Sequence, residues 1–171
     1  GQVVAPPVTH HVYTVAIDQK RAVLTQVLTH EPTSQALVFC RTKHGSDRVG
    51  EHLERAGIKT AVIHGNKSQG ARTRALGDFK TGRVNVLVAT DIAARGLDIA
   101  HLPLVINYDL PLVAEDYVHR VGRTGRAGRR GRAVSLVSGT DSRLLRDIQR
   151  LLPTPLEQVA VQGFEAPDVS P

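Results

Sequence analysis

The chain has 171 residues, of which 41% are hydrophobic and 22% are charged, so it has room for one domain with a hydrophobic core and is neither a disordered polymer nor a fibrous repeat. No apolar run approaches the roughly 20 residues that cross a bilayer, and no secretory signal opens the sequence, so we expect neither a membrane-embedded nor a secreted protein. The net charge of +6 comes from one segment, because residues 119–132 hold six arginines and no acid while the other residues balance at 16 basic and 16 acidic, and such focused charge indicates an anion site.

Apolar runs and capping residues predict alternating strands and helices along the chain. In chain order, the pattern predicts a strand at 12–17, a helix at 21–28, a strand at 36–40, a helix at 46–56, a strand at 59–63, a helix at 68–79, a strand at 84–90, a strand at 104–108, a helix at 114–121, a strand at 133–137 and a helix around 144–151. Asp18 and Ser68 are expected to cap the helices that follow them, and Gly57 is expected to end the helix before it. The last helix is expected to carry an apolar stripe formed by Leu144, Leu145, Ile148 and Leu151.

This alternation predicts βαβ units with right-handed crossovers, and therefore a single α/β domain with a mostly parallel sheet and helices on both faces. We place the domain at residues 9–163, after an N-terminal tail or linker at 1–8 and before a C-terminal tail at 164–171. Ligands of such sheets gather at the carboxyl ends of the strands. That edge is expected to carry Arg41, Thr42, residues 64–69, Thr90 and Asp91.

The string HRVGRTGR, residues 119–126, continues into AGRRG and is the most informative part of the sequence. Its glycines recur every three residues, but four triplets without proline cannot form a collagen triple helix, and the spacing does not match the dinucleotide fingerprint G-x-G-x-x-G. A disordered Arg/Gly tail is an alternative, although a predicted strand and helix follow the string. Because planar guanidinium groups can neutralise the charge of a transferring phosphoryl group, we predict that the segment acts on a bound triphosphate.

Five strings follow one another along the chain: LVFCRTK, HGNKSQGAR, ATDIAARGLDI, VINYDLP and YVHRVGRTGR. They have the order and spacing of the C-terminal-lobe motifs of DEAD-box helicases. From about residue 9 to residue 163, the chain therefore resembles the RecA-like C-terminal domain of a DEAD-box ATP-dependent RNA helicase. Asn66, where many members have Asp, and the string LLPTPLEQVAVQGFEAP are most similar to the bacterial RhlE-type subgroup.

The resemblance implies nucleotide contacts for four residues. Arg123 and Arg126 match the two catalytic arginines that reach the γ-phosphate of ATP, and Arg126 is the better candidate for an arginine finger. Asp98 matches the carboxylate that binds the ATP ribose hydroxyl, with Gly96 as a close backbone approach nearby. Asp98 could instead pair with Arg95 in a purely structural role.

The resemblance also implies RNA-backbone contacts, and it gives the set Thr42, Gly65, Gln69, Arg72 and Thr90. Such groups touch phosphate and sugar and read no bases, so RNA binding is expected to be largely independent of sequence. Structural alternatives are that Thr90 ends its strand and that Ser68 and Gln69 serve a helix N-terminus.

His119 and Arg120 match positions that tie the motif to the other lobe or hold it within its own lobe. The sequence contains neither a G-x-x-x-x-G-K-[ST] phosphate loop nor a D-E-A-D string. The resemblance implies that an N-terminal lobe of the same polypeptide holds the ATP phosphates and Mg²⁺, so the isolated chain is expected not to hydrolyse ATP. ATP and RNA would close the two lobes, and hydrolysis would reopen them. The absence of Met, even at position 1, also suggests a piece of a longer protein.

Two other functions stay open on the sequence alone, namely a stand-alone RNA-binding or scaffolding module and a lobe of a related DNA helicase. The eight histidines show no metal-ligand spacing, and we expect no metal site in the chain. Cys40 lies in a buried-strand pattern, which favours an inert core thiol and a reducing cytoplasm. One conflict concerns Arg126: a loop that leads from a helix into a strand normally lies at the opposite sheet edge, so its place in the cleft rests on the resemblance.

Overall fold

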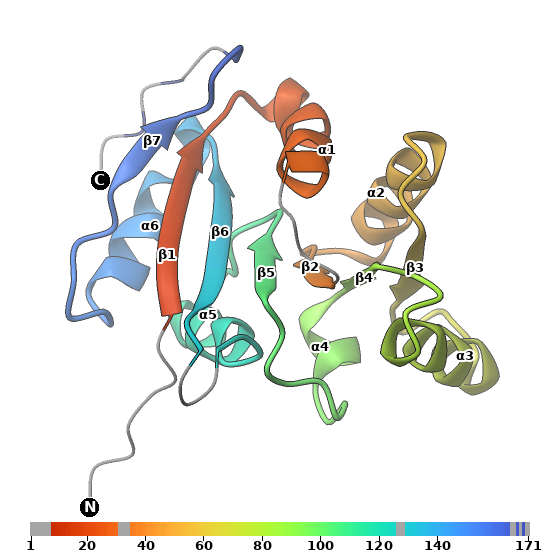
Figure 1. The fold of residues 1–171 in the computed structure, drawn as a ribbon. Coiled ribbons are helices and arrows are strands. Elements are labelled where there is room, and N and C mark those ends of the chain that lie inside the picture. Colours follow the sequence, from red (N-terminus) through yellow and green to blue (C-terminus); the bar gives the residue numbers. More distant parts are fainter. Residues whose placement is uncertain (1–7, 31–34, 126–128, 165–166, 168, 170–171) are drawn as a thin grey trace, which may run out of the picture.

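The computed structural model describes residues 8–30, 35–125, 129–164, 167 and 169. Within these residues, seven strands form one parallel sheet in the order β3-β4-β2-β5-β6-β1-β7 (Figure 1). The strands are β1 (Val8–Thr14), β2 (Ala36–Phe39), β3 (Thr60–Ile63), β4 (Val86–Ala89), β5 (Leu104–Asn107), β6 (Gly131–Val137) and β7 (Gln158–Ala160). The helices are η1 (Ile17–Gln19), α1 (Lys20–His30), α2 (Lys43–Arg55), α3 (Gln69–Lys80), α4 (Asp91–Ala94), α5 (Ala114–Val121), η2 (Gly139–Asp141) and α6 (Ser142–Gln149). The predicted α/β fold with a parallel sheet is confirmed.

Three adjacent inner strands, β4, β2 and β5, are buried along their whole length because both faces of the sheet are covered. In the sheet, Leu37 of β2 lies between Leu87 and Val105, and these three side chains belong to one core cluster. The next residue, Val38, belongs to the core cluster on the opposite face. This alternation explains why the strands read as continuous apolar runs in the sequence.

Helices pack on both faces of the sheet. Helices α1 and α2 lie on one face, where Leu53 of α2 joins the same cluster as alternate residues of β2, β4 and β5. On the other face, Phe79 of α3 packs in the second cluster, and Tyr117 of α5 packs with β1, β6 and α6 in a third. Since Ala133 of this third cluster pairs in register with Val105, α5 lies on the same face as α3.

Strand β1 begins and ends earlier in the sequence than predicted. Strand β1 covers Val8–Thr14 instead of residues 12–17, because its register is set by pairing with β6, in which Val8 lies opposite Gly131. Asp18 lies inside the short helix η1, and α1 starts at Lys20, so the prediction that Asp18 caps this helix is wrong.

Two helix starts depend on hydroxyl caps. Thr42 Oγ1 accepts a hydrogen bond from the backbone nitrogen of Gly45 at 2.9 Å, so α2 begins at Lys43, three residues before the predicted start. Ser68 Oγ accepts one from Ala71 at 3.1 Å, which confirms Ser68 as the N-cap of α3.

The C-terminal region differs most from the prediction. Helix α6 ends at Gln149 and Leu151 is 44% exposed, so the apolar stripe does not extend to Leu151. Strand β7 was not predicted. Beyond residue 163, Phe164 packs against the cluster of α1 and α2, and Val169 is buried in the cluster of α5 and α6. Across the described residues, no helix combines the length and apolar character needed to cross a membrane.

Candidate functional site

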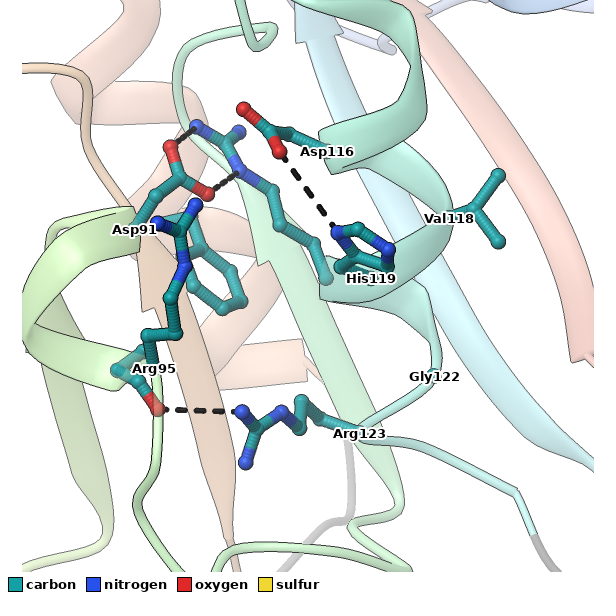
Figure 2. Close-up of a pocket in the computed structure, with 10 residues that line it drawn as sticks. Asp91, Arg95, Asp116, Val118, His119, Gly122 and Arg123 are labelled. Atoms are coloured by element: carbon teal, nitrogen blue, oxygen red, sulfur yellow. Dashed lines mark hydrogen bonds and ion pairs between the residues drawn. The ribbon is translucent and has the colours of Figure 1, made fainter.

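Arg120, in the last turn of α5, is buried at the centre of the site with 1% of its surface exposed. Its Nε and Nη2 donate to the two carboxylate oxygens of Asp91, both at 2.7 Å (Figure 2). Its Nη1 donates to Asn107 Oδ1 at 3.1 Å and to the Asp109 carbonyl at 2.6 Å. The guanidinium carbon also lies 5.0 Å from the centroid of the Phe39 ring. Arg120 therefore binds α5 to the carboxyl ends of β2, β4 and β5 within this domain.

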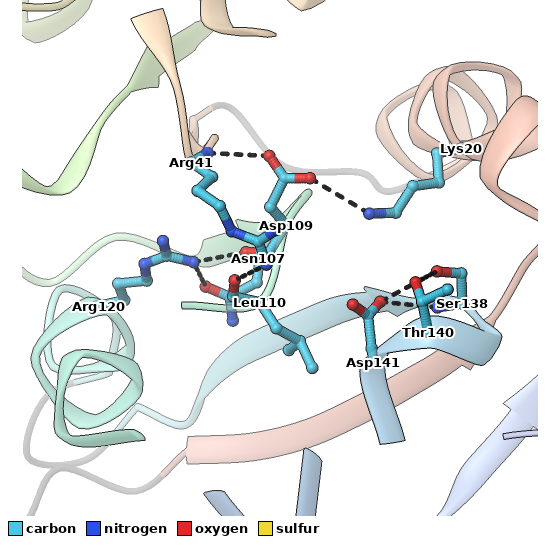
Figure 3. Close-up of polar contacts among 9 residues, drawn as sticks. All are labelled: Lys20, Arg41, Asn107, Asp109, Leu110, Arg120, Ser138, Thr140 and Asp141. Carbon is cyan, nitrogen blue, oxygen red and sulfur yellow. Dashed lines mark hydrogen bonds and ion pairs between the residues drawn. The ribbon is translucent and has the colours of Figure 1, made fainter. Parts of the chain in front are cut away.

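Asp109, just after β5, extends this network toward α1. Its carboxylate accepts a hydrogen bond from the Arg41 backbone nitrogen at 2.9 Å and one from Lys20 Nζ at 3.4 Å (Figure 3). Arg41 Nη2 donates to the Leu110 carbonyl at 2.6 Å. Lys20 is buried, and its ammonium lies 5.0 Å from the Tyr108 ring centroid. Sequence reasoning missed Lys20 and Asp109, because no residue pattern marks a buried ion pair.

A pocket of about 790 Å³ opens at the carboxyl ends of β2, β3 and β4, and we call it the strand-end pocket. Its wall includes Thr42, Gly65 and Thr90, which are three of the five predicted RNA contacts, together with the exposed side chain of Ile92. These residues come from three separate strings of the sequence. The structure thus brings them together as the sheet topology predicts.

The other two predicted RNA contacts do not line this pocket. Gln69 is the exposed first residue of α3, and Arg72 lies one turn further along that helix. Arg72 Nε is buried and has no hydrogen-bond partner among the described residues. Thr90 is 8% exposed and precedes α4 without capping it through its side chain, so its position at the strand end agrees with the structural alternative as well.

A second pocket, of about 510 Å³, lies between α4 and α5, and we call it the α5 pocket (Figure 2). Its wall includes Arg95, His119 and Arg123 as well as the Arg120–Asp91 pair. The side chain of His119 is 76% exposed, and its Nδ1 lies 3.7 Å from Asp116 Oδ1. His119 therefore faces solvent, whereas its neighbour Arg120 is enclosed.

Arg123 grips the loop that follows α4. Its guanidinium donates to the carbonyls of Leu97 at 2.7 Å, Ile99 at 3.0 Å and Ala94 at 3.1 Å. This loop carries Gly96, whose φ of +81° lies in the left-handed region that favours glycine. Arg123 therefore connects the Arg/Gly segment, residues 119–132, to the loop with the predicted nucleotide contacts Gly96 and Asp98.

Asp98 lies on the same loop but not in the α5 pocket. Its side chain is 97% exposed, and its nearest ion-pair partner is Lys80, at 3.6 Å. The alternative pairing of Asp98 with Arg95 is therefore not the one that forms. Asp98 lines a separate hollow of about 140 Å³ with Lys80 and Ile99.

Arg126 lies outside the described residues, but the residues before it show which edge the segment follows. The backbone nitrogen of Leu102 donates to the Arg123 carbonyl at 3.0 Å, and Thr124 Oγ1 donates to the Leu102 carbonyl. A Cβ on Gly131 would lie 2.3 Å from the Gly125 nitrogen, so this position requires glycine. Since Leu102 precedes β5, residues 123–125 lie at the amino end of that strand, as expected for a loop that leads from a helix into a strand.

Cys40 is a free, buried cysteine. Burial, followed by the charge of Asp109, raises the pKa of the Cys40 thiol far above its ordinary value, so this buried residue is no nucleophile. In the part of the chain that the structure describes, no three His, Cys, Asp or Glu side chains gather as metal ligands.

Comparisons with known proteins agree with this geometry. Residues 19–128 match the helicase conserved C-terminal domain. The chain is 42% identical to the ATP-dependent RNA helicase DeaD of Klebsiella pneumoniae over 160 residues, which are 94% of this chain and 25% of that protein. It is also 42% identical to DEAD-box ATP-dependent RNA helicase 14 of Arabidopsis thaliana, over 91% of this chain and 26% of that one. The chain thus spans about a quarter of the length of these relatives.

Two solved structures are similar over nearly their whole length. The Escherichia coli DEAD-box protein SrmB, in a crystal with regulator of ribonuclease activity A, has a TM-score of 0.86 and 33% identity, with 100% of this chain and 99% of that chain covered. The C-terminal domain of the DEAD-box protein Dbp5 has a TM-score of 0.84 and 30% identity, with 92% of each chain covered.

Proposed function

This chain belongs to the helicase conserved C-terminal domain family, among its DEAD-box members, and from that premise we propose that it is the second lobe of an ATP-dependent RNA helicase. The observation that carries the proposal is the convergence of Thr42, Gly65 and Thr90 on the strand-end pocket. Hydroxyls and backbone groups at one sheet edge suit the phosphates and sugars of an RNA strand. We propose that an RNA strand passes over this edge of the sheet, and that Gln69 and Arg72 contact the RNA backbone outside the pocket.

We further propose that the loop after α4 and the Arg/Gly segment form one half of an ATP site. The exposed carboxylate of Asp98 suits a hydrogen bond from a ribose hydroxyl. Because Gly96 has no side chain, the protein backbone at this position can approach the nucleotide closely. Arg123 holds the loop through three carbonyls. Arg126 is proposed as the arginine finger, from the match of its position to the family motif.

The N-terminal lobe is proposed to supply the groups that this sequence lacks, including the phosphate loop and the ligands of Mg²⁺. Bound ATP would supply the phosphoanhydride whose hydrolysis lets the lobes separate. The exposed His119 is proposed to face the N-terminal lobe, whereas Arg120 holds the motif in its own lobe. On this view the chain contributes positioning and positive charge, and it has no ATPase activity alone. The RhlE-type subgroup stays a prediction.

The test compares this chain with a longer protein in which a DEAD-box N-terminal lobe precedes it. We expect ATP turnover of the chain alone to equal the buffer background, and turnover of the two-lobed protein to rise on addition of single-stranded RNA but not of DNA. RNA-dependent turnover by the chain alone would refute the half-site assignment. A two-lobed protein that binds RNA without hydrolysing ATP would favour a scaffolding module, and stimulation by DNA would favour a DNA helicase.

A further inference from the structure

Lys43, the first residue of α2, lies in the wall of the strand-end pocket and is exposed. Its Nζ donates a hydrogen bond to Asn66 Oδ1 at 3.1 Å. A Cβ built on Gly65 would lie 3.3 Å from Lys43 Cε, so the lysine stem packs closely over the Gly65 backbone. Within the described residues, Lys43 has no carboxylate partner, and its charge is therefore oriented but not neutralised.

The loop that carries Asn66 is clamped to α2 by a buried histidine. His64 is 3% exposed, and its Nδ1 accepts a hydrogen bond from the Asn66 backbone nitrogen at 3.1 Å. Because a backbone N–H can only donate, the ring proton must be on Nε2, which donates to Asp47 Oδ1 at 2.9 Å. Lys67 Nζ lies 3.3 Å from the same Asp47 oxygen. Asn66 thus has a fixed backbone from which to hold Lys43.

Asp47 is bound by His64 and Lys67 and does not pair with Lys43. Burial raises the pKa of Asp47, but the hydrogen bonds from His64 and Lys67, together with the charge of Lys67, outweigh burial and lower that pKa. The carboxylate is therefore ionised near neutral pH, with both partners already bound.

The two carboxylates that line the strand-end pocket do not compensate Lys43 either. Asp91 is bound by Arg120 at both oxygens, and Asp116 lies 3.7 Å from His119. A cation beside an open pocket, with only a neutral amide as its partner, suits an anionic ligand. Since the same wall holds Thr42, Gly65 and Thr90, the chemistry of that ligand is a phosphodiester of an RNA strand.

We propose that Lys43 binds a backbone phosphate of single-stranded RNA in the strand-end pocket, and that the neutral side chain of Asn66 sets the strength of this contact by orienting the ammonium without neutralising it. The inference rests on the proposed function, because it assigns a further RNA contact to the same pocket. A carboxylate in place of the Asn66 amide would compete with RNA for the same ammonium.

The experiment measures RNA affinity of the two-lobed protein with a non-hydrolysable ATP analogue. The probes are fluorescent oligo(U) and oligo(A) RNAs of about ten nucleotides, titrated from about 50 mM to about 200 mM salt. The variants are Lys43→Gln, which removes the charge, and Asn66→Asp, which neutralises it in place. Lys59→Gln is the matched control, because Lys59 is an exposed lysine that lines a hollow at the amino ends of β2 and β4.

We expect Lys43→Gln to reduce the log-log salt slope by about 0.7 and to weaken binding roughly fivefold near 0.1 M salt, equally for both RNAs. Asn66→Asp should reduce the slope at least as much, and Lys59→Gln should leave it unchanged. The KM for ATP at saturating RNA should be unaltered in all three variants. These readouts separate loss of a phosphate contact from misfolding.

Failure of this inference is distinguishable from failure of the proposed function. If the unsubstituted protein binds no RNA, the proposed function itself is refuted. If it binds RNA while Lys43→Gln and Asn66→Asp keep its affinity and salt slope, only the assignment of Lys43 is wrong. A loss confined to one of the two RNAs would also contradict a phosphate contact, because it would show base recognition.

Discussion

Two arginines three positions apart, Arg120 and Arg123, hold two regions of the site in different ways. Arg120 is enclosed and pairs with a carboxylate, so the strand-end pocket is framed by part of the folded core. Arg123 is partly exposed and donates only to backbone carbonyls of the loop that carries Gly96 and Asp98. Release of Arg120 would therefore leave a partly buried carboxylate unpaired beside the pocket, whereas release of Arg123 would free backbone carbonyls of the loop after α4.

The largest effect is expected at Arg126, because a catalytic role there would make ATP hydrolysis depend on the Arg/Gly segment. In the two-lobed protein, Arg126→Ala should reduce RNA-stimulated ATP turnover by roughly a thousandfold to a hundred-thousandfold, or about 4 to 7 kcal/mol in the barrier. Arg126→Lys should be nearly as impaired, since it keeps the charge but loses the planar fork. Thermal melting should be unchanged. Turnover within about threefold of the unsubstituted protein in either variant would remove Arg126 from the catalytic role.

The next largest effect is expected on the stability of the domain, at the buried Arg120. Arg120→Ala leaves Asp91 and Asn107 without their partner and should lower the free energy of unfolding of the 171-residue chain by about 3 to 5 kcal/mol, measured by denaturant titration. The free energy of unfolding of Arg120→Lys should lie between that of the unsubstituted chain and that of Arg120→Ala. A loss below about 1 kcal/mol for Arg120→Ala would mean that the buried network does not frame the pocket.

Arg123 should have a smaller and local effect. Arg123→Ala removes three hydrogen bonds from a charged donor, and we expect a cost of about 1.5 to 3 kcal/mol for opening the loop. Amide hydrogen exchange of residues 95–99 should accelerate while that of β2 stays unchanged, and the KM for ATP should rise. Unchanged exchange together with lost turnover would instead place Arg123 on the phosphate.

The smallest effect concerns the contact between β1 and α5, where His10 Nδ1 lies 2.7 Å from the Tyr117 hydroxyl. Burial, together with the neighbouring His11, lowers the pKa of His10 below its usual value of about 6.5. The unfolded chain therefore takes up a proton at higher pH than the folded chain does. Stability should fall as the pH drops below about 6.5, and the fall should end once the folded chain is protonated as well.

The check on this pH dependence uses His10→Asn as the reference. The difference in unfolding free energy between the unsubstituted chain and this variant should shrink or reverse from pH 7.5 toward about pH 5. If this difference does not depend on pH, protonation of His10 does not weaken its contact with Tyr117 of α5.

The sheet and most helices could be predicted because hydrophobic burial leaves a periodic trace. Runs such as residues 36–40 are apolar at every position since both faces of β2 are covered. The helix predicted at 114–121 has the bounds of α5. Ser68 was predictable as a cap because its side chain acts on its own helix.

What could not be predicted depends on distant partners. Lys20 and Arg120 are nearly fully buried, yet a lone lysine or arginine in a sequence looks like a solvated side chain. Their burial depends on Asp109 and Asp91, which are 89 and 29 residues away in the sequence. Strand β7 was missed for a similar reason, since Gln158–Ala160 is too short for periodicity and forms only because β1 lies beside it.

Strand β7 also changes how this sheet meets other molecules. Its three residues pair with Val12–Thr14, so the outermost strand on that side is short and exposed (Figure 1). Without it, the outermost strand would be the seven-residue β1, a long row of unpaired backbone groups that could template pairing with another chain. Gln158–Ala160 thus covers the outer edge of β1 along Val12–Thr14, and this shortens the row of β1 backbone groups with which another chain could pair.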